Sequence, residues 1–294
     1  MLDSLFGVPT PLLIAQIVIG LINGSFYALM SLGLAIIFGL LRVVNFAHGA
    51  QFMLGAFVAW GLIEYLGIGY WWSLLLAPLT VGAFGILVER LMLRRLYRFD
   101  HVYALLLTFG LSLILEGAFR LKFGASGQPY PNPISGGLET SIAFVPWYRL
   151  WVIGASLAVC LTTWFTIERT KLGSYLRAAQ ENSALVRTFG INVPRMLMLT
   201  YGLGAGLAGL SGVMAAPIYQ VSPLMGVNLV ITVFAVVVIG GMGSIIGSIV
   251  AGFSLGVLEG LTKVFYPDAT GLVIFLAMII VLAFKPNGLF GSNE

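Results

Sequence analysis

Residues 12–41 read Leu12-Leu-Ile-Ala-Gln-Ile-Val-Ile-Gly-Leu-Ile-Asn-Gly-Ser-Phe-Tyr-Ala-Leu-Met-Ser-Leu-Gly-Leu-Ala-Ile-Ile-Phe-Gly-Leu-Leu41 and contain no charged side chain. As a helix this run would extend about 45 Å, whereas the hydrocarbon core of a bilayer is roughly 30 Å thick. The run must therefore tilt, break or start outside the membrane. A break at Asn23-Gly24-Ser25 and a continuous tilted helix are equally good interpretations, because broken helices are tolerated where they face protein or water.

The rest of the chain repeats this pattern. Hydrophobic residues make up 59% of the 294 residues and charged residues only 9%, a composition that excludes a water-soluble fold. We predict an all-α fold, a polytopic transmembrane helical bundle of about eight or nine spans in a single domain over residues 1–294. A short segment that ends in Gly240-Gly241-Met-Gly243 has a re-entrant or broken helix as its alternative. The predicted spans are 12–41, 47–66, 71–93, 101–121, 149–167, 196–217, 226–241, 244–264 and 270–285.

Positive charges collect in two connections, and these predict the orientation. Lys and Arg are enriched in cytoplasmic loops, so both connections are expected in the cytoplasm. Alternating crossings then place the N-terminus in the periplasm, the C-terminus in the cytoplasm and the Pro- and Gly-rich loop of about 122–148 outside. The net charge of +4 follows from this placement and does not indicate nucleic acid as a partner. The basic residues are Arg90, Arg94, Arg95 and Arg98 in the first connection, and Arg169, Lys171, Arg177, Arg187 and Arg195 in the second.

Two predicted helices carry polar stripes. Residues four apart lie on one helix face, and polar side chains inside a membrane face protein or water. Such a face either lines a transport path or hydrogen-bonds to neighbouring helices, and the spacing does not distinguish the two roles. The stripes are Asn23, Tyr27 and Ser31 in the first span, and Thr108, Ser112 and Glu116 in the fourth. Glycines spaced by four, as at Gly252, Gly256 and Gly260, predict closely packed helices.

The remaining reactive side chains favour structural roles. Glu116 and Glu259 each precede a basic residue by four positions, so ion pairs with Arg120 and Lys263 are the simplest interpretation. The two histidines, His48 and His101, lack the spaced partners of a metal site. The lone Cys160 sits in an apolar run and is expected in the core. The sequence contains no G-x-x-x-x-G-K-[ST] phosphate loop, so we expect the chain to bind no cofactor and to hydrolyse no ATP by that route.

The second basic connection, about 168–195, is predicted to contain an amphipathic helix. Residues 173–190 read as one helix that stops at Gly190, with Pro194 preventing immediate continuation. Ala178, Leu185 and Phe189 would share a face. That face needs either a groove on a partner protein or the membrane surface, and spacing alone leaves both open.

Several motifs resemble a known family. The first are Asn23-Gly-Ser-Phe-Tyr-Ala-Leu-Met-Ser-Leu-Gly33 and Asn45-Phe-Ala-His-Gly49. Leu172-Gly173, Gly190-Ile191-Asn192 and Val238-Ile-Gly-Gly-Met-Gly-Ser244 continue the match over most of the chain. Together they resemble the inner-membrane permease subunit of bacterial branched-chain amino acid ABC importers, and the chain length is similar to the smaller of the two permeases in such systems.

The resemblance implies partners. These are a second homologous permease, two cytoplasmic ATPase subunits that use ATP-Mg, a periplasmic substrate-binding protein and membrane lipid. It places the 173–190 helix in an ATPase groove. The coupling residues implied are Arg177, Ala178, Ala179, Glu181, Leu185, Phe189 and Gly190. The common importer loop begins Glu-Ala-Ala, whereas this chain has Arg177-Ala178-Ala179, so the contact made by position 177 is expected to differ.

The expected function is import of branched-chain amino acids, with the chain itself acting as a transport subunit and not as an enzyme. The candidate path residues are Asn23, Tyr27, Asn45, His48, Thr108 and Ser112. Asn45 and His48 have bracing of the turn between the first two spans as their alternative role. Permeases for urea or short amides are similar around Asn-Phe-Ala-His-Gly and remain an alternative. An ion-coupled transporter is disfavoured, because the acidic residues lie mostly near span ends.

Overall fold

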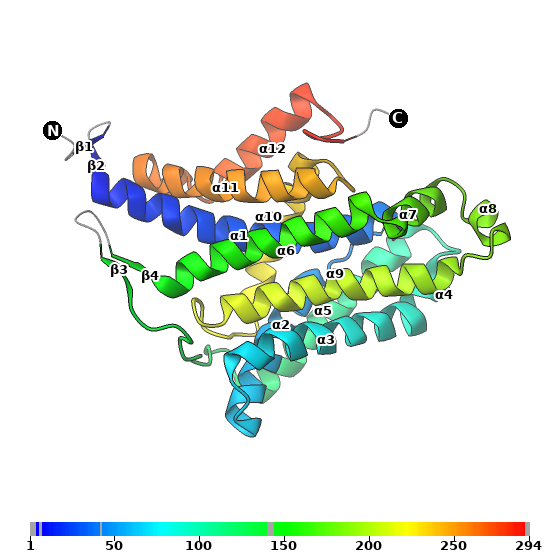
Figure 1. Cartoon of the computed structure of the whole chain (residues 1–294), viewed down its shortest axis with the longest axis horizontal. Helices are drawn as coiled ribbons and strands as arrows, with labels where there is room; N and C mark the ends of the chain where they lie inside the picture. Colours follow the sequence, from blue (N-terminus) through cyan, green and yellow to red (C-terminus); the bar gives the residue numbers. More distant parts are fainter. Residues whose placement is uncertain (1–3, 6–7, 42, 140–143, 292–294) are drawn as a thin grey trace.

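The computed structural model describes residues 4–5, 8–41, 43–139 and 144–291, and shows a bundle of long helices that run side by side (Figure 1). In this part of the chain, seven helical segments are long and apolar enough to cross a membrane. They are α1 (Thr10–Leu41), α2 (His48–Leu66), α3 with its continuation (Tyr70–Leu96), α5 (His101–Phe123), α6 (Trp147–Arg169), α9 (Val193–Ala215) and α11 (Ile245–Phe265). Two shorter apolar helices, α10 (Met225–Gly240) and α12 (Val273–Phe284), stand where the other two spans were predicted.

Short elements gather at the two ends of the bundle. At one end of Figure 1 lie the strands β1 (Ser4–Leu5) and β2 (Val8–Pro9), and β3 (Gly137–Glu139) and β4 (Phe144–Pro146). Each pair forms an antiparallel hairpin, which the sequence did not predict. At the other end lie α4 (Arg94–Leu96), α7 (Lys171–Glu181) and α8 (Ser183–Thr188). The predicted orientation puts the first end outside and the second in the cytoplasm.

The first helix is continuous from Thr10 to Leu41, so of the two interpretations the unbroken helix is confirmed and the break at Asn23-Gly24-Ser25 is excluded. Gly24 serves packing instead, because a side chain at this position would press on the backbone of Phe253 in α11. The Ser25 hydroxyl donates to the Leu21 carbonyl within the helix, at 2.8 Å. A helix of this length spans about 48 Å, so it must tilt or extend beyond the hydrocarbon core.

Glycines bring α1 against α11. A Cβ placed on Gly20 would lie only 2.5 Å from the carbonyl oxygen of Gly256, so the two backbones touch directly. Gly252 and Gly260 approach α1 in the same way, which confirms the close packing predicted from their spacing. Together these contacts make α1 the most enclosed span, whereas α5 and α6 are the least buried.

The two shorter apolar helices, α10 and α12, end at the same side of the bundle. The amide of Leu289 donates to the carbonyl of Ile239 at 2.8 Å, and the amide of Phe290 donates to that of Gly240 at 3.1 Å. The tail after α12 therefore closes against the turn between α10 and α11. At the opposite end, Gln128 and Val221 exchange two backbone hydrogen bonds of 2.8 and 3.0 Å, which attach the 124–136 loop to the connection between α9 and α10.

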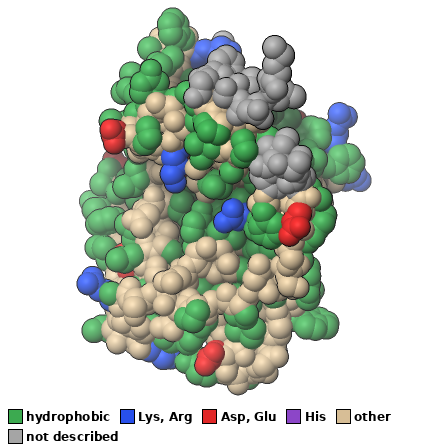
Figure 2. All heavy atoms as spheres, turned by 90° about the vertical axis from the view of Figure 1, so that its left-hand side faces the viewer, with side chains coloured by type: hydrophobic (Ala, Val, Ile, Leu, Met, Phe, Trp, Pro, Cys, Tyr) green, Lys and Arg blue, Asp and Glu red, His purple; other side chains and the backbone are tan. Residues whose placement is uncertain are grey.

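The molecular surface fits a membrane environment. Seen from the end that carries the N-terminus, hydrophobic side chains line both flanks and charged ones are few (Figure 2). Large apolar side chains that are more than half exposed occur on several spans, among them Leu79, Ile114 and Ile279. In water such a surface would aggregate, whereas lipid tails cover it without cost.

Candidate functional site

The connection between α1 and α2 folds back into the bundle. Nε2 of His48, at the start of α2, lies 2.9 Å from the carbonyl oxygen of Met30, well before the end of α1 at Leu41. At about 1.5 Å per residue, the chain returns about 16 Å along α1 before α2 begins. The non-helical residues 43–47 therefore lie at bundle depth, with Asn45 and His48 fully buried. Irregular backbone at such depth requires hydrogen-bond partners from the protein.

Asn45 supplies some of these partners. Its Oδ1 accepts from the amide of Ala47 at 3.1 Å, and its Nδ2 donates to Oε1 of Gln51 at 3.3 Å. Gln51 in turn donates to the hydroxyl of Tyr201 on α9, also at 3.3 Å. This buried chain of polar groups ties the connection to α2 and α9. Gln51 and Tyr201 were not among the predicted site residues, although Gln51 follows His48 by only three positions.

Thr108 holds the connection from the other side. The amide of Phe46 donates to Oγ1 of Thr108 on α5 at 3.2 Å, and the single Thr108 hydroxyl proton has two alternative acceptors, the carbonyls of Leu105 (3.0 Å) and Val44 (3.3 Å). Thr108 has no exposed surface in this chain. Of the six predicted path residues, the structure thus brings together Asn45, His48 and Thr108, all around one turn.

An aromatic cluster covers the turn. The ring of Phe46 packs between Phe234 on α10, with centroids 4.9 Å apart, and Phe109 on α5, at 6.0 Å. Phe109 is about half exposed, so the cluster reaches the surface between α5 and α10. A Cβ on Gly49 would lie 2.6 Å from the carbonyl oxygen of Gly226, so α10 begins beside the start of α2, inside the bundle. This explains why the predicted span 226–241 is short, and it agrees with the broken-segment alternative.

The other predicted path residues lie elsewhere. The Tyr27 hydroxyl donates to Oε2 of Glu259 on α11 at 2.7 Å, and Asn23 accepts from the Tyr219 hydroxyl at 2.6 Å. We call Asn23, Tyr27, Tyr219 and Glu259 the outer polar group. The expected pairing of Glu259 with Lys263 is not what the described residues show. The Glu259 carboxylate instead accepts from Tyr27, a side chain of the packed helix α1. Among the described residues the one ion pair joins Arg177 to Glu168.

Ser112 also has a partner that spacing did not suggest. Its hydroxyl donates to Oε1 of Glu116 at 3.0 Å, one turn further along the same helix. The stripe on α5 is therefore divided, because Thr108 serves the buried turn and Ser112 serves Glu116. Ser112 keeps about 8% of its surface exposed.

The coupling segment forms two helices, so the single predicted helix over 173–190 is wrong. Asn182 has an extended backbone and its side chain accepts from the amide of Leu185 at 2.9 Å, which ends α7 and caps α8. Ala178 and Leu185 consequently do not share one continuous helix face. Gly190 ends the segment with φ 79°, a conformation that favours glycine, as predicted.

One face of this segment packs on the bundle and the other is open. Leu176, Ala179 and Val186 are buried, the last two together with Val193 of α9. Leu185 is 54% exposed and Phe189 76% exposed. Ala178, Glu181 and Arg177 are exposed as well, and Arg177 lies 3.4 Å from the Glu168 carboxylate on the surface. Of the predicted coupling residues, Ala179 is thus buried against the bundle, whereas the others lie on the open side, where Leu185 and Phe189 form an uncovered apolar surface.

Taken together, the apolar spans, the buried non-helical turn and the exposed segment at one end define a multi-pass helical membrane protein. A family model described as the permease component of branched-chain amino acid transport systems matches residues 16–283. The chain belongs to this family, which confirms the resemblance and the fold class predicted from the sequence.

Curated relatives agree. The chain is 31% identical to the high-affinity branched-chain amino acid transport system permease protein BraD of Pseudomonas aeruginosa, over 95% of this chain and 96% of that protein. It is 29% identical to the permease protein LivH of Escherichia coli K12, with 94% of both chains covered. The permease protein LivM of Salmonella typhimurium is 27% identical, over 90% of this chain and 67% of that protein. No solved structure matches this chain.

Proposed function

We propose that this chain is a permease subunit of an ATP-driven importer that moves branched-chain amino acids into the cytoplasm. The family and the names of BraD and LivH support the substrate class. The structural observation that carries the proposal is the coupling segment. It is anchored to α9 through Val186 and Val193, and it presents Leu185 and Phe189 to the outside at one end of the bundle.

This surface suits an ATPase partner better than lipid. Exposed charged and polar residues of the same segment, including Arg187 and Thr188, lie between the exposed leucine and phenylalanine in the sequence. A soluble subunit docked here would pull directly on α9, and through Tyr201 and Gln51 on the buried turn at Asn45. Closure of two ATPase subunits around ATP-Mg would thereby reach the centre of the membrane domain. ATP hydrolysis belongs to those subunits, and this chain supplies the path.

The path is proposed to run along a face shared with a second permease. Salmonella typhimurium has both LivH and LivM among the relatives of this chain, which supports a heterodimer of two homologous permeases. The outer polar group offers neutral and acidic partners to a zwitterion near the periplasmic end. From there the proposed path leads inward beside Ser112, Phe109 and Phe46, past the buried turn that holds Asn45, His48 and Thr108. A periplasmic binding protein would deliver the amino acid, and the N-terminus would lie on that side.

Co-purification from cells that express all candidate subunits tests the class of transporter. An affinity tag on this chain should retain a second permease and ATPase subunits in stoichiometric amounts. The matched control is the Phe189→Asp variant, which should retain the second permease and lose the ATPases. A tagged chain that purifies alone and transports an amino acid down an ion gradient would overturn the proposal in favour of a secondary transporter.

A further inference from the structure

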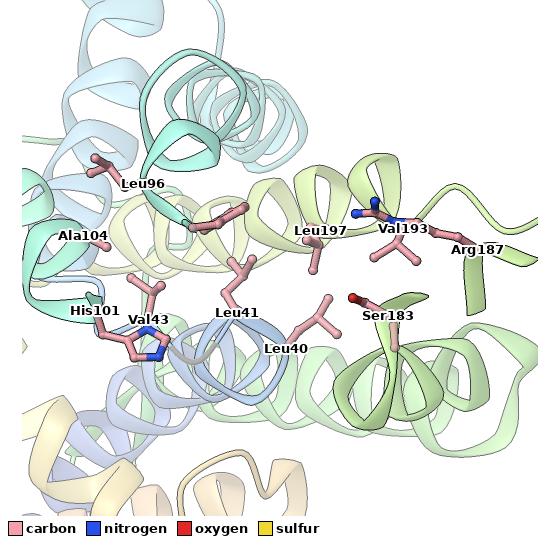
Figure 3. Close-up of a pocket in the computed structure, with 12 residues that line it drawn as sticks. Leu40, Leu41, Val43, Leu96, His101, Ala104, Ser183, Arg187, Val193 and Leu197 are labelled. Carbon is pink, nitrogen blue, oxygen red and sulfur yellow. The ribbon is translucent and has the colours of Figure 1, made fainter. Parts of the chain in front are cut away.

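A cavity lies where the coupling segment meets the bundle. Its volume is about 330 Å³, and its walls come from the end of α1, the starts of α5 and α9, and the helices α4, α7 and α8 (Figure 3). Leu41 ends α1, His101 begins α5 and Val193 begins α9, so three spans terminate around it. The cavity therefore stands at a membrane boundary, which is the cytoplasmic one if the proposed orientation holds.

The polar side chains of the cavity face each other across an apolar floor. Arg187 and Ser183 stand on one side and His101 on the other, with Leu40, Leu41 and Leu197 between or beneath them (Figure 3). No described lining residue carries a carboxylate. Arg187 forms no ion pair with any described residue. Tyr97, which also lines the cavity, stays neutral, because burial and the nearby Glu89 carboxylate raise the pKa of its hydroxyl.

This combination selects among ligands. A guanidinium with a neighbouring hydroxyl is a recognition pair for phosphate or carboxylate oxygens, and leucine side chains accept hydrocarbon. A zwitterionic amino acid would bring an ammonium group that needs an anionic partner, which the described lining does not offer. An anion with an attached acyl chain fits both parts, and basic pockets between spans at the cytoplasmic side bind such headgroups.

We propose that this cavity binds an anionic phospholipid of the adjoining leaflet, with its phosphate at Arg187 and Ser183 and acyl carbon along Leu40 and Leu197. The bound lipid would join α8 to α1 and α9, so it would stabilise the coupling segment on the bundle. The assignment of the lipid to the cytoplasmic leaflet depends on the proposed orientation, whereas the binding site does not.

Thermal unfolding of the full-length chain in an uncharged detergent tests the site. Phosphatidylglycerol should raise the melting temperature with saturation, whereas phosphatidylcholine of the same acyl composition should not. Arg187→Gln should weaken the apparent affinity for phosphatidylglycerol on the order of tenfold, the effect of one strong charge-assisted contact. Arg195→Gln is the matched control, because it removes an exposed charge close by that does not line the cavity, and it should leave the affinity unchanged.

Equal stabilisation of the unsubstituted chain by both lipids would overturn the proposal, and that comparison needs no variant to fold. Equal weakening by the two arginine substitutions would also overturn it, since binding would then depend only on general surface charge. Inorganic phosphate as effective as the lipid would reject the lipid as ligand, and stabilisation by leucine through Arg187 would make the cavity an amino acid site. Both ends of the protein are accessible in detergent, so none of these results depends on orientation or on ATPase partners. A failure of the proposed importer function would show in co-purification instead.

Discussion

Nε2 of His48 lies 2.9 Å from the carbonyl oxygen of Met30, although the two residues are separated by the whole second part of α1 and the turn that follows it. This contact fixes how far the chain folds back before α2 begins. His48 is fully buried, and its ring also touches Gly33, where a Cβ would lie 3.1 Å from Cε1 of the imidazole. The histidine is thus a brace for the buried turn.

Replacement of His48 by alanine should destabilise the protein by about 1–3 kcal/mol, because a buried hydrogen bond is lost and a cavity is left. The melting temperature of the purified chain should fall, and the folded yield with it. His101→Ala, the same deletion at an exposed histidine, should change stability by less than about 0.5 kcal/mol. Equal melting temperatures for the two variants would show that the contact with Met30 does not brace the turn.

Gly20→Ala should destabilise the bundle by about 1–3 kcal/mol through overpacking, because the new methyl group would press on the Gly256 carbonyl. Gly117→Ala on α5 is the matched control. Its methyl group meets nothing within 4 Å, so the higher helix propensity of alanine should leave stability equal or slightly raised. Thermal melts of both variants in one detergent make the comparison. Unchanged stability of Gly20→Ala would contradict direct backbone contact between α1 and α11.

Phe189→Asp should leave the isolated chain as stable as before, since the side chain is 76% exposed. It should nevertheless abolish ATPase binding, because a charge would have to enter the docking groove. Val186→Asp should instead lower the melting temperature of the isolated chain, because Val186 is only 5% exposed and the new charge would disrupt packing on Val193. Pull-down of ATPase subunits together with melting curves separates these effects. Normal ATPase binding by the Phe189 variant would leave lipid as the partner of this surface.

Cysteine labelling tests the orientation. In a Cys160→Ala background, a cysteine at Asn132 should react with an impermeant thiol reagent in intact spheroplasts. A cysteine at Ser174, which is exposed on α7, should react only after permeabilisation. The basic connections at 90–98 and 169–195 motivate this expectation. The reverse labelling pattern would place α7 and α8 outside and remove them from any ATPase.

Most of the fold follows from the sequence, because hydrophobic length is a strong signal. The spans 101–121 and 244–264 differ from α5 and α11 by at most two residues at either end. Gly252, Gly256 and Gly260 predict close packing from spacing alone, and they pack on α1. These features depend on local composition and on the length of each hydrophobic run, and both can be read from the sequence.

The site was less predictable, because its contacts join residues far apart in the chain. Nothing near Glu259 in sequence points to Tyr27, and Lys263 offers a closer partner. The break at Asn182 was not predicted, because asparagine occurs inside helices as well as at their ends. Its role as the cap of α8 is evident only from the hydrogen bond with the Leu185 amide. The depth of the turn at Asn45 depends on the contact between His48 and the Met30 carbonyl, and residue spacing does not predict that contact.

Uptake of radiolabelled leucine into proteoliposomes tests the central claim most directly. Vesicles should contain this chain with its partner permease and ATPase subunits, ATP inside and the leucine-loaded binding protein outside. We predict that leucine accumulates, that its accumulation requires both ATP and the binding protein, and that it is lost in the Phe189→Asp variant. Accumulation that proceeds without ATP, or uptake of urea or short amides in place of leucine, would contradict it.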